Sequence, residues 1–108
     1  MGFLYVQTYV VSKGKAKEHD DCIKKMYEMW KDKWKVHGAR KEPKLLSQRW
    51  GPMGARVFIL EFDNYTDYQR FFNAISEDEE ASAIREEWLT YIEPITWKAV
   101  FWNELMPD

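Results

Sequence analysis

A chain of 108 residues fits one domain, residues 1–108, which can bury a core without disulfide bonds. Its 16 basic and 18 acidic residues give a formal charge of −2, which argues against a nucleic-acid-binding or anionic-membrane-binding surface. The single cysteine, Cys22, excludes an internal disulfide and suits a reducing cytoplasm. No apolar run reaches the roughly 20 residues of a membrane span, and the N-terminus lacks a signal-peptide pattern. We therefore expect a cytoplasmic protein.

The first two elements are predicted to be a strand over residues 3–11 and a long helix over residues 15–36. One face of the strand consists of Leu4, Val6, Thr8 and Val10, and the other of Phe3, Tyr5, Gln7, Tyr9 and Val11. The helix carries a stripe at the helical spacing of three or four, comprising His19, Ile23, Met26, Trp30, Trp34 and His37. Gly38 is expected to end this helix in a left-handed conformation.

A hairpin is predicted next, in which residues 40–50 and 55–63 form the second and third strands. Pro43 cannot donate to a ladder, so the second strand should lie at a sheet edge. Residues 51–54, Gly-Pro-Met-Gly, form a compact turn. In the third strand one face is wholly apolar, and it consists of Phe58, Leu60 and Phe62.

Two helical stretches and a last strand complete the chain. Asn64 is predicted to cap the first of these helices, and Ser76 with Glu79 predicts a capping box for a helix over residues 77–92. Residues 95–102 read as the last strand. The order predicts an α+β fold with a four-stranded antiparallel sheet, the first and third strands in its centre and all helices on one face.

The helices can cover only one face of this sheet. We expect that face to carry Leu4, Val6, Val10, Phe58, Leu60, Phe62, Trp97 and Phe101. The other face would expose a large apolar patch, which typically marks an interface, and a second copy of the chain is its simplest cover. The predicted homodimer interface comprises Tyr5, Gln7, Tyr9, Ile59, Glu61, Lys98 and Trp102. Glu61 and Lys98 should be paired or hydrogen-bonded there, because unpaired buried charges are costly.

Three segments carry a resemblance to a known superfamily: residues 49–54 (RWGPMG), 58–68 (FILEFDNYTDY) and 95–98 (ITWK). They resemble the dimeric α/β-barrel superfamily of ferredoxin-like folds, and within it NIPSNAP-like and antibiotic-biosynthesis-monooxygenase-like small proteins. The resemblance implies a βαββααβ domain, a homodimer and a small-molecule pocket between sheet and helices. The superfamily includes cofactor-free monooxygenases, isomerases, haem proteins and proteins without known chemistry, so the activity stays open.

Aromatic side chains from the helices and the last strand should converge between helices and sheet. They form either a densely packed core or a cavity for an aromatic ligand, with Tyr68, Trp50 or His37 as its polar group. The candidate ligand-binding residues are Trp34, His37, Trp50, Tyr68, Trp88 and Trp97. No set of catalytic residues can be assigned.

The two histidines, His19 and His37, share a helix face but lie about 27 Å apart along the axis, too far to bind one metal ion. A haem that needs one histidine ligand is the alternative to two histidines that end the buried stripe. Residues 19–22, His-Asp-Asp-Cys, resemble metal ligands in composition, but consecutive helical residues point in different directions, which favours a solvated helix start. We expect no metal and no cofactor.

Two functions from different classes remain. One is a homodimeric small-molecule-binding protein that acts as a cofactor-independent monooxygenase or isomerase on an aromatic substrate, which requires a cavity between sheet and helices. The other is a non-enzymatic structural or regulatory homodimer, which predicts a filled core and no perturbed ionisable group outside the interface.

Overall fold

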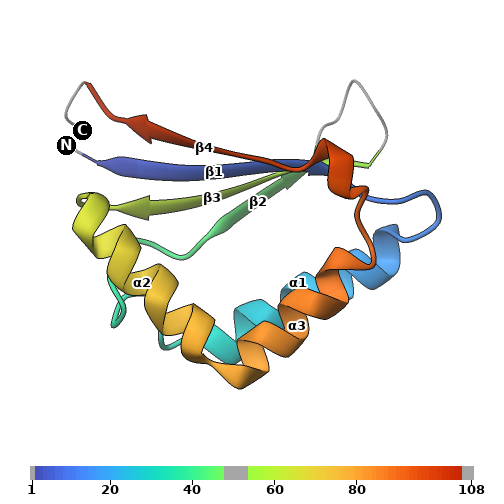
Figure 1. The fold of residues 1–108 in the computed structure, drawn as a ribbon, viewed down its shortest axis with the longest axis horizontal. Coiled ribbons are helices and arrows are strands. Elements are labelled where there is room, and N and C mark those ends of the chain that lie inside the picture. The colour runs from blue at the N-terminus through green and yellow to red at the C-terminus, as the bar shows by residue number, and fades with distance from the viewer. Residues whose placement is uncertain (1, 48–53, 106–108) are drawn as a thin grey trace.

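The computed structural model describes residues 2–47 and 54–105. Its elements are β1 (Phe3–Val10), α1 (Ala16–Trp30), β2 (Lys44–Ser47), β3 (Ala55–Phe62), α2 (Tyr65–Glu77), α3 (Glu79–Leu89), the 3₁₀ turn η1 (Pro94–Thr96) and β4 (Lys98–Asn103). Figure 1 shows two layers, with the strands in one and the three labelled helices together on one side of it. No helix in the described part of the chain has both the length and the apolar character to span a membrane.

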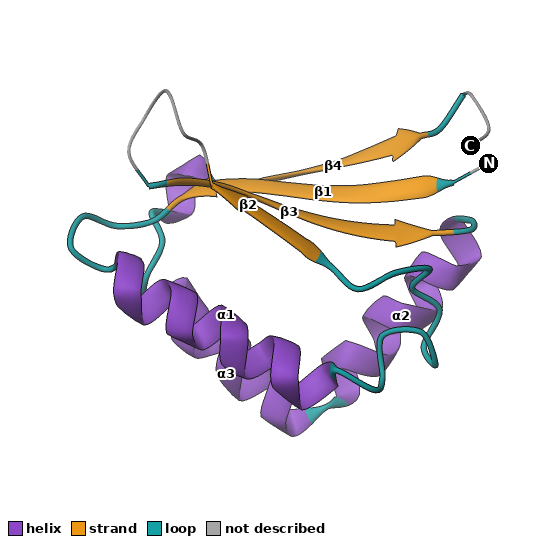
Figure 2. Ribbon diagram, turned by 180° about the vertical axis from the view of Figure 1, so that it is seen from behind, coloured by secondary structure: helices purple, strands orange, loops and turns teal. Residues whose placement is uncertain are grey.

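The strands form a four-stranded antiparallel sheet in the order β2-β3-β1-β4. This confirms the predicted central positions of the first and third strands, and β2 follows Pro43 at an edge (Figure 2). The edge strands are shorter than predicted: β2 begins at Lys44, and residues 94–96 form η1 before β4 begins at Lys98. The predicted turn residues 51–53 and Trp50 lie outside the described residues.

The first helix ends earlier than predicted, at Trp30 instead of residue 36. The N–H groups of Lys33 and Trp34 both donate to the Trp30 carbonyl oxygen, at 2.8 and 3.2 Å, and the chain continues as tighter turns. These turns keep the Trp34 ring stacked on Phe71 of α2, with ring centroids 5.7 Å apart. Gly38 ends the turns with φ of 115°, as its predicted left-handed role requires.

Of the two predicted helix caps, the structure confirms the one for α2 and contradicts the one for α3. Asn64 caps α2 as predicted, because its side chain accepts a hydrogen bond from the Asp67 N–H at 2.9 Å. The predicted cap Ser76 is wrong: α2 continues through it, and Asp78 caps α3 by accepting from the Ala81 N–H at 3.1 Å. The Asp78 carboxylate also accepts from Trp30 Nε1 at 3.1 Å, a second bond that ties the α2–α3 corner to α1.

The prediction of which β1 side chains lie under the helices is wrong. Tyr5 lies opposite Leu60 and Gln7 opposite Phe58, so Tyr5, Gln7 and Tyr9 share the helix-covered face of β3 and do not face away from the helices. Tyr5 and Tyr9 are buried there. Alternation could not decide this, because both faces of β1 are apolar; the register with β3 decides it.

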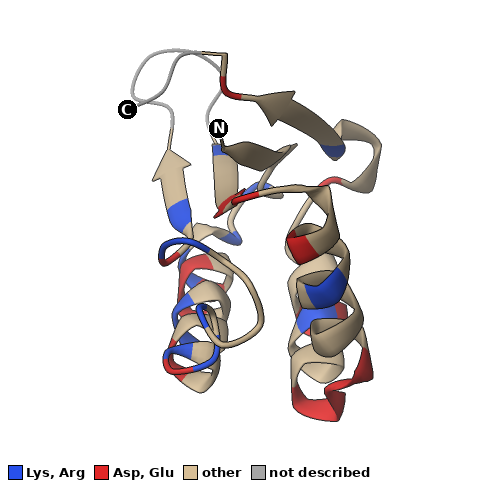
Figure 3. Cartoon of the chain, turned by 90° about the vertical axis from the view of Figure 1, so that its left-hand side faces the viewer, with Lys and Arg blue, Asp and Glu red and all other residues tan. Residues whose placement is uncertain are grey.

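The open face of the sheet carries the other set of side chains. Leu4, which was expected under the helices, lies opposite Glu61 on one side and Trp102 on the other, and Val6 lies opposite Ile59 and Val100. Trp102 is 58% exposed. No described element covers this face in Figures 1 and 2. In Figure 3 the acidic and basic residues lie mostly on the helices and connecting segments, and the strands are mostly uncharged.

The two charged residues expected in the interface do not pair with each other within one protomer. Glu61 lies opposite Leu4 and Lys98 opposite Thr8, so they stand four positions apart along β1. Glu61 instead lies 3.6 Å from Lys41 Nζ. Their pairing across an interface stays a prediction.

Candidate functional site

A cavity of about 210 Å³ lies between the helix-covered face of the sheet and the helices. It has roughly the volume of seven liquid waters and is smaller than pockets for drug-sized ligands, so it suits a ligand of one or two rings. Its lining is largely aromatic and aliphatic and includes Tyr5, Gln7, Tyr9, Phe58, Leu60, Met26, Trp34, Tyr68, Phe71, Phe72, Ile84, Arg85 and Trp88.

The cavity adjoins a second recess on the β4 side. A neighbouring recess shares Tyr5, Tyr68 and Arg85 with the cavity and adds Trp97 and Phe101 at its outer end. The two spaces therefore share part of their lining. We call the recess between α2, α3 and β4 the mouth of the cavity.

Two indole N–H groups in the cavity lining are buried and have no hydrogen-bond partner among the described residues: those of Trp34 and Trp88. Leaving such a donor unpaired costs about 1–3 kcal/mol. The Trp88 N–H is close enough to Tyr9 to favour the ionised phenol electrostatically, but it makes no hydrogen bond of good geometry. Trp34 is 1% exposed and is therefore the clearer unsatisfied donor.

Polar groups at the mouth are linked to one another. Trp97 Nε1 donates to Gln7 Oε1 at 3.2 Å, and Gln7 Nε2 donates to Tyr5 Oη at 2.9 Å. Burial raises the pKa of Tyr5, and the Gln7 hydrogen bond and the Arg85 charge oppose this effect. Arg85 forms no ion pair with any residue that the structure describes, so its charge favours an anionic group on a ligand at the mouth.

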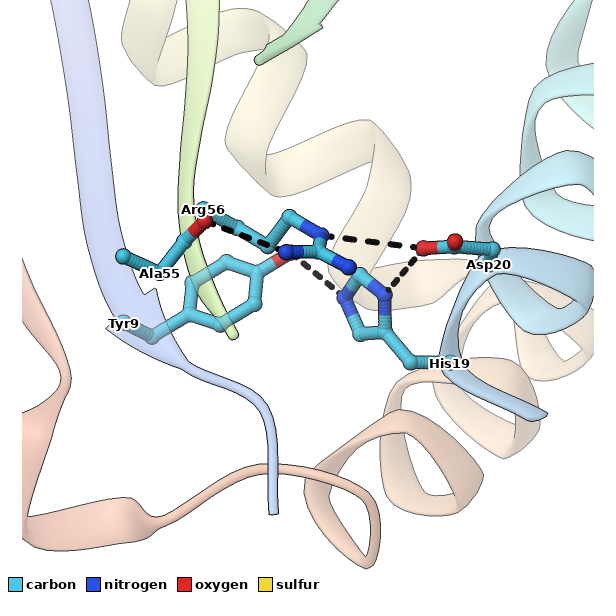
Figure 4. Close-up of polar contacts among 5 residues, drawn as sticks. All are labelled: Tyr9, His19, Asp20, Ala55 and Arg56. Atoms are coloured by element: carbon cyan, nitrogen blue, oxygen red, sulfur yellow. Dashed lines mark hydrogen bonds and ion pairs between the residues drawn. The ribbon is translucent and has the colours of Figure 1, made fainter. Parts of the chain in front are cut away.

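A second polar network links Tyr9, which lines the cavity, to His19, Asp20 and Arg56, which do not line it (Figure 4). Tyr9 Oη and His19 Nε2 are 2.7 Å apart, and His19 Nδ1 and Asp20 Oδ1 are 2.9 Å apart. Because a carboxylate only accepts, Nδ1–H donates to Asp20, and Nε2 accepts the hydrogen bond from the Tyr9 hydroxyl. Arg56 Nε lies 3.7 Å from the same Asp20 oxygen.

Burial keeps Tyr9 and His19 neutral at neutral pH. Burial raises the pKa of Tyr9 to about 12, against opposing effects of Trp88 and Arg56. Burial lowers the pKa of His19, whose side chain is fully buried, and the Asp20 hydrogen bond and charge oppose that shift. At neutral pH the pair is therefore a phenol that donates to an unprotonated imidazole.

The predicted ligand-binding residues divide into three groups. Trp34, Tyr68 and Trp88 line the cavity, and Trp97 lines its mouth. His37 does not line either space; its ring lies on Trp30 with centroids 5.2 Å apart. Trp50 lies outside the described residues.

The sequence analysis missed several lining residues and the hydrogen-bonded network. Tyr5, Gln7 and Tyr9 were assigned to the opposite face, and Arg85 was not singled out. One available signal was Gln7, a polar residue between aromatics, which needs buried partners such as the Tyr5 hydroxyl. Nothing in the sequence pattern links Tyr9 to His19, because they lie on different elements.

The residues with metal-like or nucleophilic chemistry have other partners. His19 engages both ring nitrogens, so haem ligation would break a buried hydrogen bond. The helix start is not fully solvated as predicted, because Cys22 is also buried; its thiol donates to the Ile84 carbonyl at 3.6 Å. Burial raises the pKa of Cys22 to about 11, which makes it a poor nucleophile. Within residues 2–47 and 54–105, no three His, Cys, Asp or Glu side chains form a metal-binding group.

Comparison with solved structures finds the same fold in several proteins. A NIPSNAP family protein from Agrobacterium tumefaciens is 14% identical, with a TM-score of 0.78 over 100% of this chain and 94% of that one. A proposed antibiotic biosynthesis monooxygenase from Nitrosomonas europaea is 14% identical, with a TM-score of 0.73 over 98% and 92%. SnoaB, a cofactor-independent oxygenase from Streptomyces nogalater, is 11% identical, with a TM-score of 0.72 over 98% and 95%.

No protein-family model and no curated protein sequence matches the chain. The structural similarities lie below 25% identity and therefore show the fold alone. The chain has the ferredoxin-like α+β fold shared by NIPSNAP proteins and antibiotic-biosynthesis-monooxygenase-like proteins.

The buried His19 predicts a pH-dependent stability. Its pKa in the folded chain lies below the ordinary 6.5, so the unfolded chain binds the extra proton first as pH falls. The free energy of unfolding should therefore fall below pH 6.5, with a slope approaching about 1.4 kcal/mol per pH unit until the folded pKa is reached. Urea titrations between pH 7 and 5 measure this slope.

His19→Gln should flatten the slope, because glutamine does not titrate. The matched control His37→Gln removes the other histidine and should keep the wild-type slope, since the buried imidazole remains. Parallel curves for wild type and His19→Gln would contradict the assignment.

Proposed function

We propose that this chain is a homodimeric small-molecule-binding protein that takes a small aromatic substrate into its cavity and transforms it without a cofactor, as a monooxygenase or an isomerase. The observation that carries the proposal is the cavity itself. It is lined by aromatic faces, which offer stacking surfaces to a ring, and one of its lining residues, Trp34, keeps an indole N–H without a partner among the described residues.

The reaction class is supported by chemistry and by analogy of fold. Cofactor-independent oxygenation and isomerisation both require that the protein hold the substrate away from water and transfer protons to or from it. The Tyr9 and His19 side chains beside the cavity are neutral acid–base groups of the type that such proton transfers use. SnoaB, whose fold this chain shares, is described as a cofactor-independent oxygenase.

The non-enzymatic alternative fits the described residues less well. It predicts a filled core, whereas a cavity of about 210 Å³ lies beside the packed Trp30, Phe62 and Phe71 side chains. It also predicts no perturbed ionisable group outside the interface, whereas the pKa values of Tyr9 and His19 are both shifted by burial on the helix-covered side.

The homodimer in this proposal forms through the open face of the sheet. Its support is the row formed by Val100, Val6 and Ile59 across three strands, next to an exposed Trp102. Exposed apolar patches typically mark interfaces, and a two-fold contact with the same face of a second copy would bury this one. The reducing cytoplasm is the proposed compartment, since Cys22 is a buried free thiol.

The cavity predicts specific binding of a small phenol. Wild-type protein should bind 4-nitrophenol with one site per chain in isothermal titration calorimetry. Ala81→Leu extends a buried lining residue of α3 into the space and should weaken binding at least about tenfold, which is about 1.4 kcal/mol.

Ala83→Leu is the matched control, because Ala83 is exposed on the same helix and does not line the cavity. It should bind like the wild type. Absence of binding to the wild type, or equal loss in both variants, would count against the cavity as a ligand site.

The open face predicts a dimer that one charge can disrupt. Ile59→Asp places a carboxylate in the apolar row and should shift the chain from dimer to monomer in sedimentation-velocity experiments. The control Ile95→Asp makes the same chemical change in η1, where Ile95 is 94% exposed, and should remain dimeric. A monomeric wild type would overturn the homodimer.

A further inference from the structure

The Tyr9 side chain occupies a special position in the cavity wall. It lines the cavity, and its hydroxyl is hydrogen-bonded at 2.7 Å to His19, which does not line the cavity. The Tyr9 ring packs edge-to-face against the Trp88 indole, with ring centroids 5.1 Å apart. The Tyr9 side chain therefore links the buried imidazole to the cavity.

The direction of the hydrogen bonds decides what Tyr9 offers to a ligand. Asp20 accepts from His19 Nδ1–H, so the Tyr9 proton points to Nε2, and the remaining lone pairs of Oη accept no hydrogen bond of good geometry from the described residues, although the Trp88 N–H lies close. A ligand hydroxyl in the cavity is the natural donor for them. The three side chains are thus arranged in the same order of roles as a hydroxyl–imidazole–carboxylate triad.

We propose that Tyr9, His19 and Asp20 form a proton relay that removes the proton from a hydroxyl group of the ligand bound in the cavity. Tyr9 is the residue that touches the ligand, and His19 and Asp20 act through it. The inference rests on the proposed function, because it needs a ligand with an O–H group in this cavity.

The transfer balances without any further reactant. The ligand O–H bond breaks and a new O–H bond forms on Tyr9, while the original Tyr9 proton moves to His19 Nε2. The electron pair of the broken bond stays on the ligand oxygen, which becomes an anion. The positive charge that appears on the imidazole is paired with Asp20 at 2.9 Å.

The environment of His19 suits a temporary rather than a permanent positive charge. Three groups face it: Asp20 from α1 itself, Arg56 from β3 and Tyr9 from β1. Asp20 favours the imidazolium, whereas Arg56 and burial disfavour it, so the resting imidazole is neutral and able to accept. The Asp20 side chain is 47% exposed, which gives the relay an outlet to solvent beyond the fully buried His19.

The ionisation of bound 4-nitrophenol tests the relay, because its phenolate absorbs visible light and its phenol does not. The absorbance of the fully bound probe is titrated with pH in the wild type and in Tyr9→Phe, which keeps the ring but has no oxygen. The wild type should hold the probe as phenolate to a pH lower by about one unit or more than Tyr9→Phe does. His19→Gln should behave like Tyr9→Phe, since glutamine accepts the hydrogen bond but not the proton.

The role of Asp20, the third residue of the relay, is tested by Asp20→Asn, with Asp21→Asn as its matched control. Asp20→Asn should raise the ionisation midpoint, whereas Asp21→Asn should leave it unchanged, because Asp21 points elsewhere and pairs with Lys17 on the surface. Arg85 is present in every variant, so its attraction for the anion cancels in the comparison.

The outcomes separate the relay from the proposed function. If 4-nitrophenol does not bind the wild type, the cavity is not a site for small phenols and both ideas fail. If the probe binds and ionises at the same pH in wild type, Tyr9→Phe and His19→Gln, the cavity is a binding site and the relay is wrong.

Discussion

The antiparallel register between β1 and β3 is the constraint on which the two faces of the sheet depend. With Tyr5 opposite Leu60 and Gln7 opposite Phe58, the aromatic side of β1 lies beneath the helices and its aliphatic side lies in the open. A slip by one residue would exchange every side chain between the two faces. The cavity lining and the open apolar patch are therefore consequences of one pairing.

The tyrosine hydroxyls that lie under the helices need hydrogen-bond partners in the protein interior. Gln7 serves Tyr5, and His19 serves Tyr9, so polar side chains enter an otherwise apolar interior in pairs. The tryptophans are only partly provided for: Trp30 donates to Asp78, whereas the Trp34 N–H has no partner among the described residues. Trp34 belongs to the packed core and also lines the candidate site.

The features that followed from the sequence were those with a local cause. The apolar face of β3, the Asn64 cap and the order of the elements each depend on residues close together in the chain, and the structure agrees with them. The sequence could not show which face of β1 lies under the helices, because both of its faces are apolar. The Asp78 cap was missed because its advantage over Ser76 includes a bond to Trp30, 48 positions away.

The candidate site was harder to predict than the fold for the same physical reason. Periodicity identified Trp34, Tyr68 and Trp88 as inward-facing, but it cannot tell whether the space between them is filled. The contact between Tyr9 and His19 joins a strand to a helix, and it exists only once the β1 register is set. Cavity volume and long-range hydrogen bonds are properties of the packed chain.

A crystal structure of the protein with 4-nitrophenol bound would test the central claim most directly. The account predicts the ring inside the cavity between sheet and helices, with its hydroxyl oxygen within hydrogen-bond distance of Tyr9 Oη. A ring bound only on the open face of the sheet, or a cavity that stays empty at saturating probe, would contradict it.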